Sequence, residues 1–365
     1  MDTRLELNRR QFVKSLAMAG GALAAGVRGV EAADSPAPAK MNNKLGLDNF
    51  AVRAMGWKAP QLIDYAASLK TDSLFITDFG PFERRDDSYL TDLQKSAADK
   101  GLQIQLGSWS ICPTSKAFKK DWGTAEEHLA LGIRMAKALG SRVFRVILGT
   151  REDRKTEGGI EARIRDTVNV LKSQRAKAMD GGVKIAVENH AGDMQAWELV
   201  TLVEQAGKEY VGVNLDSGNA AWTVEDPRES LEILGPYTLT TSLRDNMIWE
   251  TVNGAKVQWT AMGEGLMDWK AYFQRFSELC PGAPVHIETI SGFAVEFPYL
   301  KEEFWTVFPK ARAKDFAKFV ALAKRGHALE AREPSEPKAK QEYQKGEIER
   351  SIKYCQEVLG LGLKA

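Results

Sequence analysis

Several polar residues stand where buried strands should end. In KIAVENHAGD, the apolar run IAV is followed directly by Glu188, Asn189 and His190. The runs VGVNLD and VHIE end in the same way, on Asp216 and on Glu288. Each of these groups is costly to bury unless it has a partner. Carboxylates held in one pocket are suited to proton transfer, so we ask whether the fold brings them together.

The residues are positioned by a regular alternation of strands and helices. Eight β-rich runs are predicted as strands, at residues 49–55, 73–78, 103–108, 142–148, 184–188, 211–216, 239–244 and 284–288. Runs with helical periodicity separate them. Eight strand–helix units in one domain predict an α/β fold, a closed (β/α)8 TIM barrel, over residues 45–325. An open doubly wound sheet is the alternative, but no glycine-rich phosphate loop follows the first strand.

Side-chain alternation predicts the direction in which these residues point. Residues two apart on a strand share a face, so the apolar residues of VGVNLD lie opposite Asn214 and Asp216. The same alternation places Arg145, Arg244 and Glu288 on polar faces. Helices must cover the outside of a parallel barrel, so the apolar faces point outward. The polar faces are therefore expected to point toward the barrel axis.

Four strand ends then meet at one mouth of the barrel. Glu188, Asp216, Arg244 and Glu288 each end a different predicted strand, at the C-terminal face where barrel active sites are built. Three carboxylates in one pocket repel each other unless a cation or bound protons compensate. The alternative is that they are unrelated residues that cap the following helices.

The N-terminal segment has the pattern of an export signal. In residues 1–33, paired arginines precede a short apolar stretch and then small residues at a cleavage position. The segment resembles a twin-arginine signal peptide, with an ordinary secretory signal as the alternative. Residues 34–44 are expected to form a linker. The mature protein is predicted to be periplasmic or otherwise extracytoplasmic.

Composition excludes some partners. A formal net charge of +1 gives no basic surface for nucleic acid. No apolar run after the signal is long enough to cross a membrane. The three cysteines are interpreted as ordinary thiols, with a single disulfide as the alternative. The charged and then amphipathic pattern of residues 326–365 predicts a helical C-terminal extension. It is expected to pack on the barrel or to make a homo-oligomer contact.

The strand-end motifs resemble those of a known family. ENHAGD, NLDSGN, SLRDN, MGEG and HIETISG are similar to motifs of the sugar phosphate isomerase/epimerase group, in the xylose isomerase-like barrel superfamily. The resemblance covers roughly residues 45–325. It implies a divalent metal held by Glu188, Asp216 and Glu288. That metal is expected to be manganese, with magnesium, cobalt or zinc as the other options.

Two positions depart from the family pattern. The family's His-x-Lys-Asp reads SLRD at residues 242–245, and its Asp-x-x-His reads DSGN at residues 216–219. The histidine ligand has thus become a serine, whose oxygen is a weak ligand for zinc or manganese. Either water or another side chain, such as His190 or His286, completes the metal shell, or the metal is absent and Arg244 supplies the positive charge.

The resemblance also implies a reaction. Isomerising or epimerising a sugar removes a proton beside a carbonyl and returns it elsewhere, which needs a base, an acid and a positive charge. Glu188 and Glu288 are implied as the acid/base pair, and Arg244 or the metal as the electrophile. A further group of loop and strand-end residues is expected to bind the sugar: Trp109, Asn189, His190, Asn219, Gln258, Trp259 and Glu264.

A predicted hairpin completes the site. Residues 246–265 read as two strands that turn at Asn253-Gly254, and they are expected to lie over the barrel mouth as a lid. Two alternatives to the isomerase remain open. One is a lyase or hydrolase that acts on 3-keto-glycosides through the same pocket, and the other is a non-catalytic sugar-binding relative.

Overall fold

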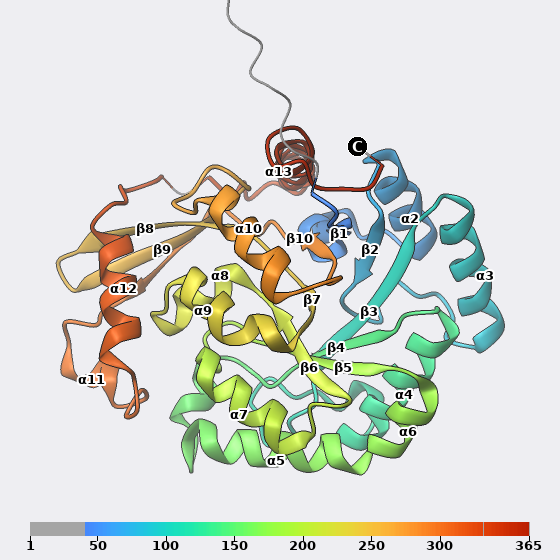
Figure 1. Cartoon of the computed structure of the whole chain (residues 1–365), viewed down its shortest axis with the longest axis horizontal. Helices are drawn as coiled ribbons and strands as arrows, with labels where there is room; N and C mark the ends of the chain where they lie inside the picture. The colour runs from blue at the N-terminus through green and yellow to red at the C-terminus, as the bar shows by residue number, and fades with distance from the viewer. Residues whose placement is uncertain (1–40, 331, 365) are drawn as a thin grey trace, which may run out of the picture. The chain divides into compact units, whose positions relative to one another are not determined.

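Eight parallel strands form the centre of the structure, which is a computed structural model describing residues 41–330 and 332–364. The strand order is β10-β1-β2-β3-β4-β5-β6-β7 (Figure 1). A parallel bridge between Leu243 and Ile287 links the two edges, so the barrel is nearly closed. The strands are β1 Leu45–Asp48, β2 Ser73–Ile76, β3 Gln103–Ser110, β4 Val143–Ile147, β5 Lys184–Glu188, β6 Val211–Leu215, β7 Thr238–Thr241 and β10 Val285–Ile287.

Helices lie between successive strands and surround the barrel (Figure 1). They are α2 Ala59–Ser68, α3 Asp87–Asp99, α4 Ala125–Ala138, α5 Gly159–Ser173, α6 Arg175–Gly181, α7 Ala196–Ala206, α8 Ser217–Ala220, α9 Pro227–Leu234 and α10 Trp269–Leu279, with short 3-10 helices η1 Asn49–Met55, η2 Lys120–Trp122, η3 Arg151–Lys155, η4 Ala221–Thr223 and η5 Gly235–Tyr237. Their apolar faces and the outer faces of the strands form one buried core. The predicted TIM barrel is therefore confirmed.

The prediction for the first strand was wrong. The segment 49–55 forms the 3-10 helix η1, and strand β1 lies immediately before it. The reason is Asp48, whose carboxylate accepts a hydrogen bond from the backbone N–H of Phe50 at 3.0 Å and so turns the chain out of the sheet. Ala51 and Val52 are buried in η1, which explains why the segment has the apolar content of a strand.

A second, smaller sheet carries the predicted hairpin. Strands β8 Asp245–Thr251 and β9 Gly254–Thr260 are antiparallel, so the predicted hairpin is confirmed. Its turn lies one residue earlier than predicted, at Val252 and Asn253, because Gly254 already pairs with Thr251. Strand β11 Ala294–Phe297 pairs with β9 on the other side. Helices α11 Glu302–Trp305 and α12 Ala313–Ala323 follow, and α12 lies against β8 (Figure 1). Phe319 of α12 belongs to a separate apolar cluster that includes Ile248 and Val257 of this sheet.

The C-terminal extension is helical, as predicted. Helix α13 Pro337–Glu357 packs against η1, where Gln344 accepts a hydrogen bond from the backbone N–H of Ala54 at 2.9 Å. Ile348 and Cys355 of this helix are fully buried in the main core. Within the described part of the chain, no helix is long and apolar enough to span a membrane. Cys112, Cys280 and Cys355 are buried free thiols.

Some predictions fall wholly or partly outside the described residues. The predicted signal peptide, residues 1–33, and most of the linker lie before residue 41. The boundaries of the barrel and of the C-terminal extension remain predictions.

Candidate active site

Four strand ends bring carboxylates to the centre of the barrel. Asp48 ends β1, Glu188 ends β5, and Asp216 and Glu288 directly follow β6 and β10. All four are buried, and Glu288 is the most exposed at 5 %. The structure thus brings together the three carboxylates selected from the sequence. The fourth, Asp48, was missed because its strand was predicted in the wrong place.

Two buried arginines compensate these charges. Arg244, between β7 and β8, donates from Nη2 to carboxylate oxygens of both Asp216 and Glu288. Arg145 of β4 donates from Nε to Glu188 Oε2 at 2.5 Å, and from Nη1 to the carbonyl of Ser108 at 2.8 Å. Buried ion pairs of this kind are retained only when hydrogen bonds satisfy both partners. Side-chain alternation predicted that Arg145 faces inward, but it did not identify Glu188 as its partner.

Amide side chains join the two ion-pair groups into one network. Asn219 Nδ2 donates to Glu188 Oε1 at 3.2 Å and to Asp216 Oδ2 at 2.7 Å. Asn189 pairs with the backbone of Asp216 in both directions, with its Nδ2 on the carbonyl and its Oδ1 on the N–H. The amide of Asn189 therefore positions Asp216 and is not free to bind substrate.

Three buried polar atoms in this network have no partner among the described residues. They are Asn214 Oδ1, Asn219 Oδ1 and Arg244 Nε. Buried polar groups in folded proteins are nearly always hydrogen-bonded, so unpartnered ones call for a ligand or ordered water. The atoms comprise two acceptors and one charged donor, which matches the hydroxyl and carbonyl groups of a sugar.

The donors present do not fit the family's four-ligand metal site. Ser242, at the position of the histidine ligand, donates to Asp48 Oδ2 at 2.9 Å. Asp216 and Glu288 share the Arg244 guanidinium, and Glu188 holds Arg145. Across residues 41–330 and 332–364, no group of three His, Cys, Asp or Glu side chains is arranged to hold a metal ion.

Neither candidate histidine completes a metal shell. His286 lies inside the barrel with Nε2 at 2.9 Å from Ser73 Oγ and Nδ1 at 3.3 Å from Thr240 Oγ1. His190 Nδ1 bonds the carbonyl of Gly149 at 2.7 Å, so Nδ1 carries the proton and Nε2 is the free acceptor. Burial lowers the pKa of His190 to about 4, and its ring is neutral at physiological pH.

The carboxylates differ in their ease of ionisation. Burial raises the pKa of Glu288, and repulsion by Glu188 adds to this effect while Arg244 opposes it. Burial likewise raises the pKa of Asp216 well above its ordinary value. Burial also disfavours the ionised form of Glu188, but Arg145 and its neighbours outweigh that effect and hold the pKa of Glu188 below its ordinary value. Surroundings that shift the pKa values of two carboxyl groups in opposite directions, as for Glu188 and Glu288, are typical of acid/base pairs.

Trp259 of the hairpin covers the centre. Its ring lies over the Arg244 guanidinium, with 4.5 Å between the guanidinium carbon and the ring centroid, and it stacks on Trp222. Its Nε1 donates to the carbonyl of Gly218 at 3.0 Å. A Cβ at Gly218 would lie 2.4 Å from Arg244 Cγ, so only glycine allows this close packing.

A cavity of about 390 Å³ adjoins the network on the side of β1 to β3. Its walls include Phe50, Asp78, Ser108, Trp109 and Trp122. Ser108 accepts from Arg145, and the Trp109 ring meets His190 edge-on with 5.3 Å between centroids. Aromatic walls with a few polar groups are typical of small-molecule sites.

The other predicted substrate residues lie elsewhere. Gln258 donates to the carbonyl of Glu330 at 3.4 Å, and the exposed Glu264 pairs with Arg350 at 3.1 Å. Both therefore face the C-terminal extension and not the carboxylates.

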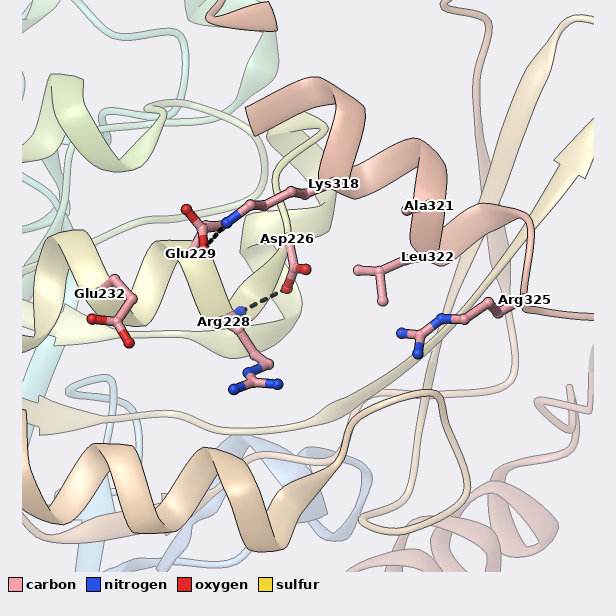
Figure 2. Close-up of a pocket in the computed structure, with 8 residues that line it drawn as sticks. All are labelled: Asp226, Arg228, Glu229, Glu232, Lys318, Ala321, Leu322 and Arg325. Atoms are coloured by element: carbon pink, nitrogen blue, oxygen red, sulfur yellow. Dashed lines mark hydrogen bonds and ion pairs between the residues drawn. The ribbon is translucent and has the colours of Figure 1, made fainter. Parts of the chain in front are cut away.

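A separate cavity of about 400 Å³ lies on the outside, between α9 and α12 (Figure 2). Within its lining, Lys318 pairs with Glu229, and Asp226 accepts a hydrogen bond from the backbone N–H of Arg228. It contains none of the predicted site residues.

The structure is a parallel (β/α)8 barrel with inward carboxylates at its C-terminal mouth and a hairpin over the central arginine. The chain belongs to the xylose isomerase-like TIM barrel family, whose profile matches residues 51–304.

Individual relatives are distant. The 3-oxo-isoapionate decarboxylase of Pectobacterium atrosepticum is 22% identical over 201 residues, which are 54% of this chain and 66% of that protein. The chain thus spans just under two thirds of that relative's length.

Two solved structures share the fold. One is a D-psicose 3-epimerase in the presence of D-fructose, with a TM-score of 0.56 and 15% sequence identity. The match covers 87% of this chain and 99% of the epimerase chain. The IolI protein with a bound zinc atom has a TM-score of 0.53 at 17% identity, covering 78% and 100%.

Proposed function

We propose that the protein is a carbohydrate isomerase or epimerase that transfers a proton next to the carbonyl of a keto-sugar. The observation that carries this proposal is the buried network of Glu188, Glu288 and Arg244, with unpartnered polar atoms beside it. Membership of the family and the epimerase among the structural neighbours support it.

The roles follow from the surroundings of each group. Glu188, held ionised by Arg145, is the base that removes the proton from the carbon next to the carbonyl. The electron pair of that C–H bond forms a carbon–carbon double bond, and the π pair of the carbonyl moves to its oxygen, which gives an enediolate. Arg244, which has a free Nε–H, stabilises the developing negative charge. Glu288, whose pKa is raised, returns a proton to carbon from its own carboxyl group.

The substrate lies between the network and the adjoining cavity in this proposal. His190 Nε2 and Asn219 Oδ1 accept hydrogen bonds from sugar hydroxyls, and Trp109 packs against the sugar ring. Asn189 acts indirectly by fixing Asp216.

In this proposal Arg145 and Arg244 supply the positive charge that the reaction needs. Manganese, implied by the resemblance, remains a prediction. A metal between Glu188, Asp216 and Glu288 would have to displace Arg244 from Asp216 and Glu288, which argues against it. We therefore expect activity to survive treatment with EDTA. Elemental analysis of the purified protein and activity with added MnCl₂ test this, and a clear gain with manganese assigns the cofactor role to the metal.

Solvent exchange tests the proposed function. The purified protein is incubated in D₂O with D-fructose, D-psicose, D-tagatose and 3-keto-glucosides, and NMR follows deuterium uptake and bond cleavage together. Exchange without cleavage is the expected result. Stable binding without exchange for every sugar favours the non-catalytic alternative.

A lyase is the second candidate function, and the similarity to 3-oxo-isoapionate decarboxylase favours it. Decarboxylation of a keto-sugar acid passes through the same kind of enediolate, so the same network serves both reactions. Release of carbon dioxide, or of an aglycone from a 3-keto-glycoside, without epimer formation identifies this reaction class.

We also propose that the protein is exported, as the N-terminal pattern predicts. A free or glycosidic sugar is then a more accessible substrate than a sugar phosphate. Fractionation of cells that express the native gene, followed by N-terminal sequencing, tests this.

A further inference from the structure

A polar cavity of about 140 Å³ lies in the seam between the hairpin, the loop after β10 and the C-terminal extension. Gln258, Trp259 and Thr260 of β9 form one wall, and Ser291 of the loop forms another. The remaining wall comes from the extension, beyond the residues that the family profile matches. It includes Glu330, Arg332, Tyr343, Glu347 and Arg350.

Two buried side chains of the β9 wall carry polar atoms that have no partner among the described residues. Gln258 is 4 % exposed and its Oε1 is unpaired, while Thr260 is 5 % exposed and its Oγ1 is unpaired. The amide of Gln258 is oriented by its Nε2, which donates to the carbonyl of Glu330 at 3.4 Å. Unpaired buried acceptors that line a cavity indicate an occupant that can donate hydrogen bonds.

The extension is held firmly against the loop at this point. Ser291 Oγ lies 2.8 Å from Tyr343 Oη and also donates to Glu347. The backbone N–H of Arg332 donates to the carbonyl of Gly292 at 2.9 Å. A Cβ at Gly292, where φ is +87°, would lie 2.6 Å from the backbone nitrogen of Glu333. Because the loop and the extension pack closely at Ser291 and at Gly292, the walls of the cavity are fixed by the fold.

The chemistry of the walls favours a neutral, polyhydroxylated occupant. Glu264 and Glu347 both pair with Arg350, so the acidic and basic groups largely compensate each other. An anion such as phosphate needs an excess of donors, whereas the unpaired atoms here include the acceptor Gln258 Oε1. A sugar hydroxyl both donates and accepts, and Trp259, which lines the cavity, adds an apolar surface.

The cavity also lies close to the catalytic residues. Trp259 is shared, because it lines the cavity and covers Arg244. Ser291 follows Glu288 by only a few residues along the same loop. We propose that this seam is a second carbohydrate subsite, built by the C-terminal extension, which favours a disaccharide or other glycoside over a monosaccharide as the substrate. The proposal rests on the proposed function, since it adds a subsite to that reaction centre.

Binding measurements with defined probes test the subsite. Isothermal titration compares D-glucose with its disaccharides cellobiose, maltose and trehalose on the full chain. At least one disaccharide is expected to bind tenfold or more tightly than glucose. In Gln258→Leu and Thr260→Val, which keep the side-chain size, the ratio of disaccharide to glucose affinity is expected to fall about tenfold.

The matched control is Thr251→Val, on the same hairpin, where the hydroxyl bonds the exposed Glu296 outside the cavity. It is expected to keep the wild-type ratio, and thermal melting verifies that all three variants are folded. If every disaccharide binds no more tightly than glucose, or if Gln258→Leu and Thr260→Val keep the wild-type ratio, the cavity holds solvent only and the proposal is overturned. Failure of deuterium exchange with every sugar is a separate result, which overturns the proposed function.

Discussion

Glu188 and Glu288 share one chemistry but have different partners. Among the carboxylates of the site, Arg145 bonds only Glu188, whereas Arg244 bonds both Asp216 and Glu288. Strand alternation was enough to predict that these carboxylates face inward, because the apolar residues on either side must face the helices. It was not enough to predict the pairing, because partners on separate strands depend on the register of the closed barrel.

Arg244 gives a prediction at this scale. Replacing it in Arg244→Met leaves Asp216 and Glu288 buried without their cation, and breaking a buried pair in this way costs about 3–5 kcal/mol. Loss of the enediolate stabiliser is expected to lower the exchange rate at least about a hundredfold. Urea denaturation and exchange kinetics measure the two effects.

The control for that variant is Arg275→Met. Arg275 makes two ion pairs on the surface, with Glu232 and Glu278, and exposed pairs contribute only about 0–1 kcal/mol. The assignment of Arg244 is wrong if both variants unfold at the same urea concentration and retain wild-type exchange.

The loop that leads from η4 to α9 is held by a buried carboxyl group. Glu225 accepts from Thr223 Oγ1 at 2.7 Å and from the backbone N–H of Ala196, the first residue of α7, at 3.1 Å. Burial raises the pKa of Glu225 from 4.5 to about 8. Nothing in the local sequence distinguishes this glutamate from exposed ones, because its burial depends on how α7 and the loop pack.

Stability is therefore expected to depend on pH through Glu225. The folded state binds a proton between pH 4.5 and about 8 that the unfolded state has released, so stability falls as the pH rises through this range. Glu225→Gln removes that proton linkage and keeps both hydrogen bonds. The variant should be more stable than the wild type at pH 9, by on the order of 2–4 kcal/mol, and the difference should shrink toward pH 5.

Thermal melting from pH 5 to pH 9 measures the effect, with Glu204→Gln as a control at an exposed glutamate. Parallel stability curves for Glu225→Gln and the wild type would show that Glu225 is ionised in the folded state.

At the scale of the whole molecule, the family barrel and the C-terminal extension share one core. Helix α13 follows the barrel in sequence but contacts η1 and β1, at the start of the barrel, and its Ile348 lies in the main core. The sequence predicted the extension as a charged helix. It left open whether the helix packs on its own barrel or on another copy, because an amphipathic face does not identify its partner.

Truncating Ile348 tests this packing. The side chain is fully buried, and Ile348→Ala is expected to lower the free energy of unfolding by about 2–5 kcal/mol in a single transition. Lys345→Ala on the exposed face of α13 should change it by less than about 0.5 kcal/mol. Equal effects of the two substitutions in urea denaturation would show that α13 does not stabilise the barrel.

The central claim is that Glu188 and Glu288 move a proton at the carbon next to a sugar carbonyl. The most direct measurement is deuterium uptake from D₂O into the keto-sugar panel, followed by NMR for the wild type, Glu188→Gln and Glu288→Gln. We predict uptake by the wild type and a loss of at least about a hundredfold in each variant, with the folded structure retained. Uptake at the wild-type rate in Glu188→Gln, or no uptake by the wild type with any of these sugars, would contradict the account.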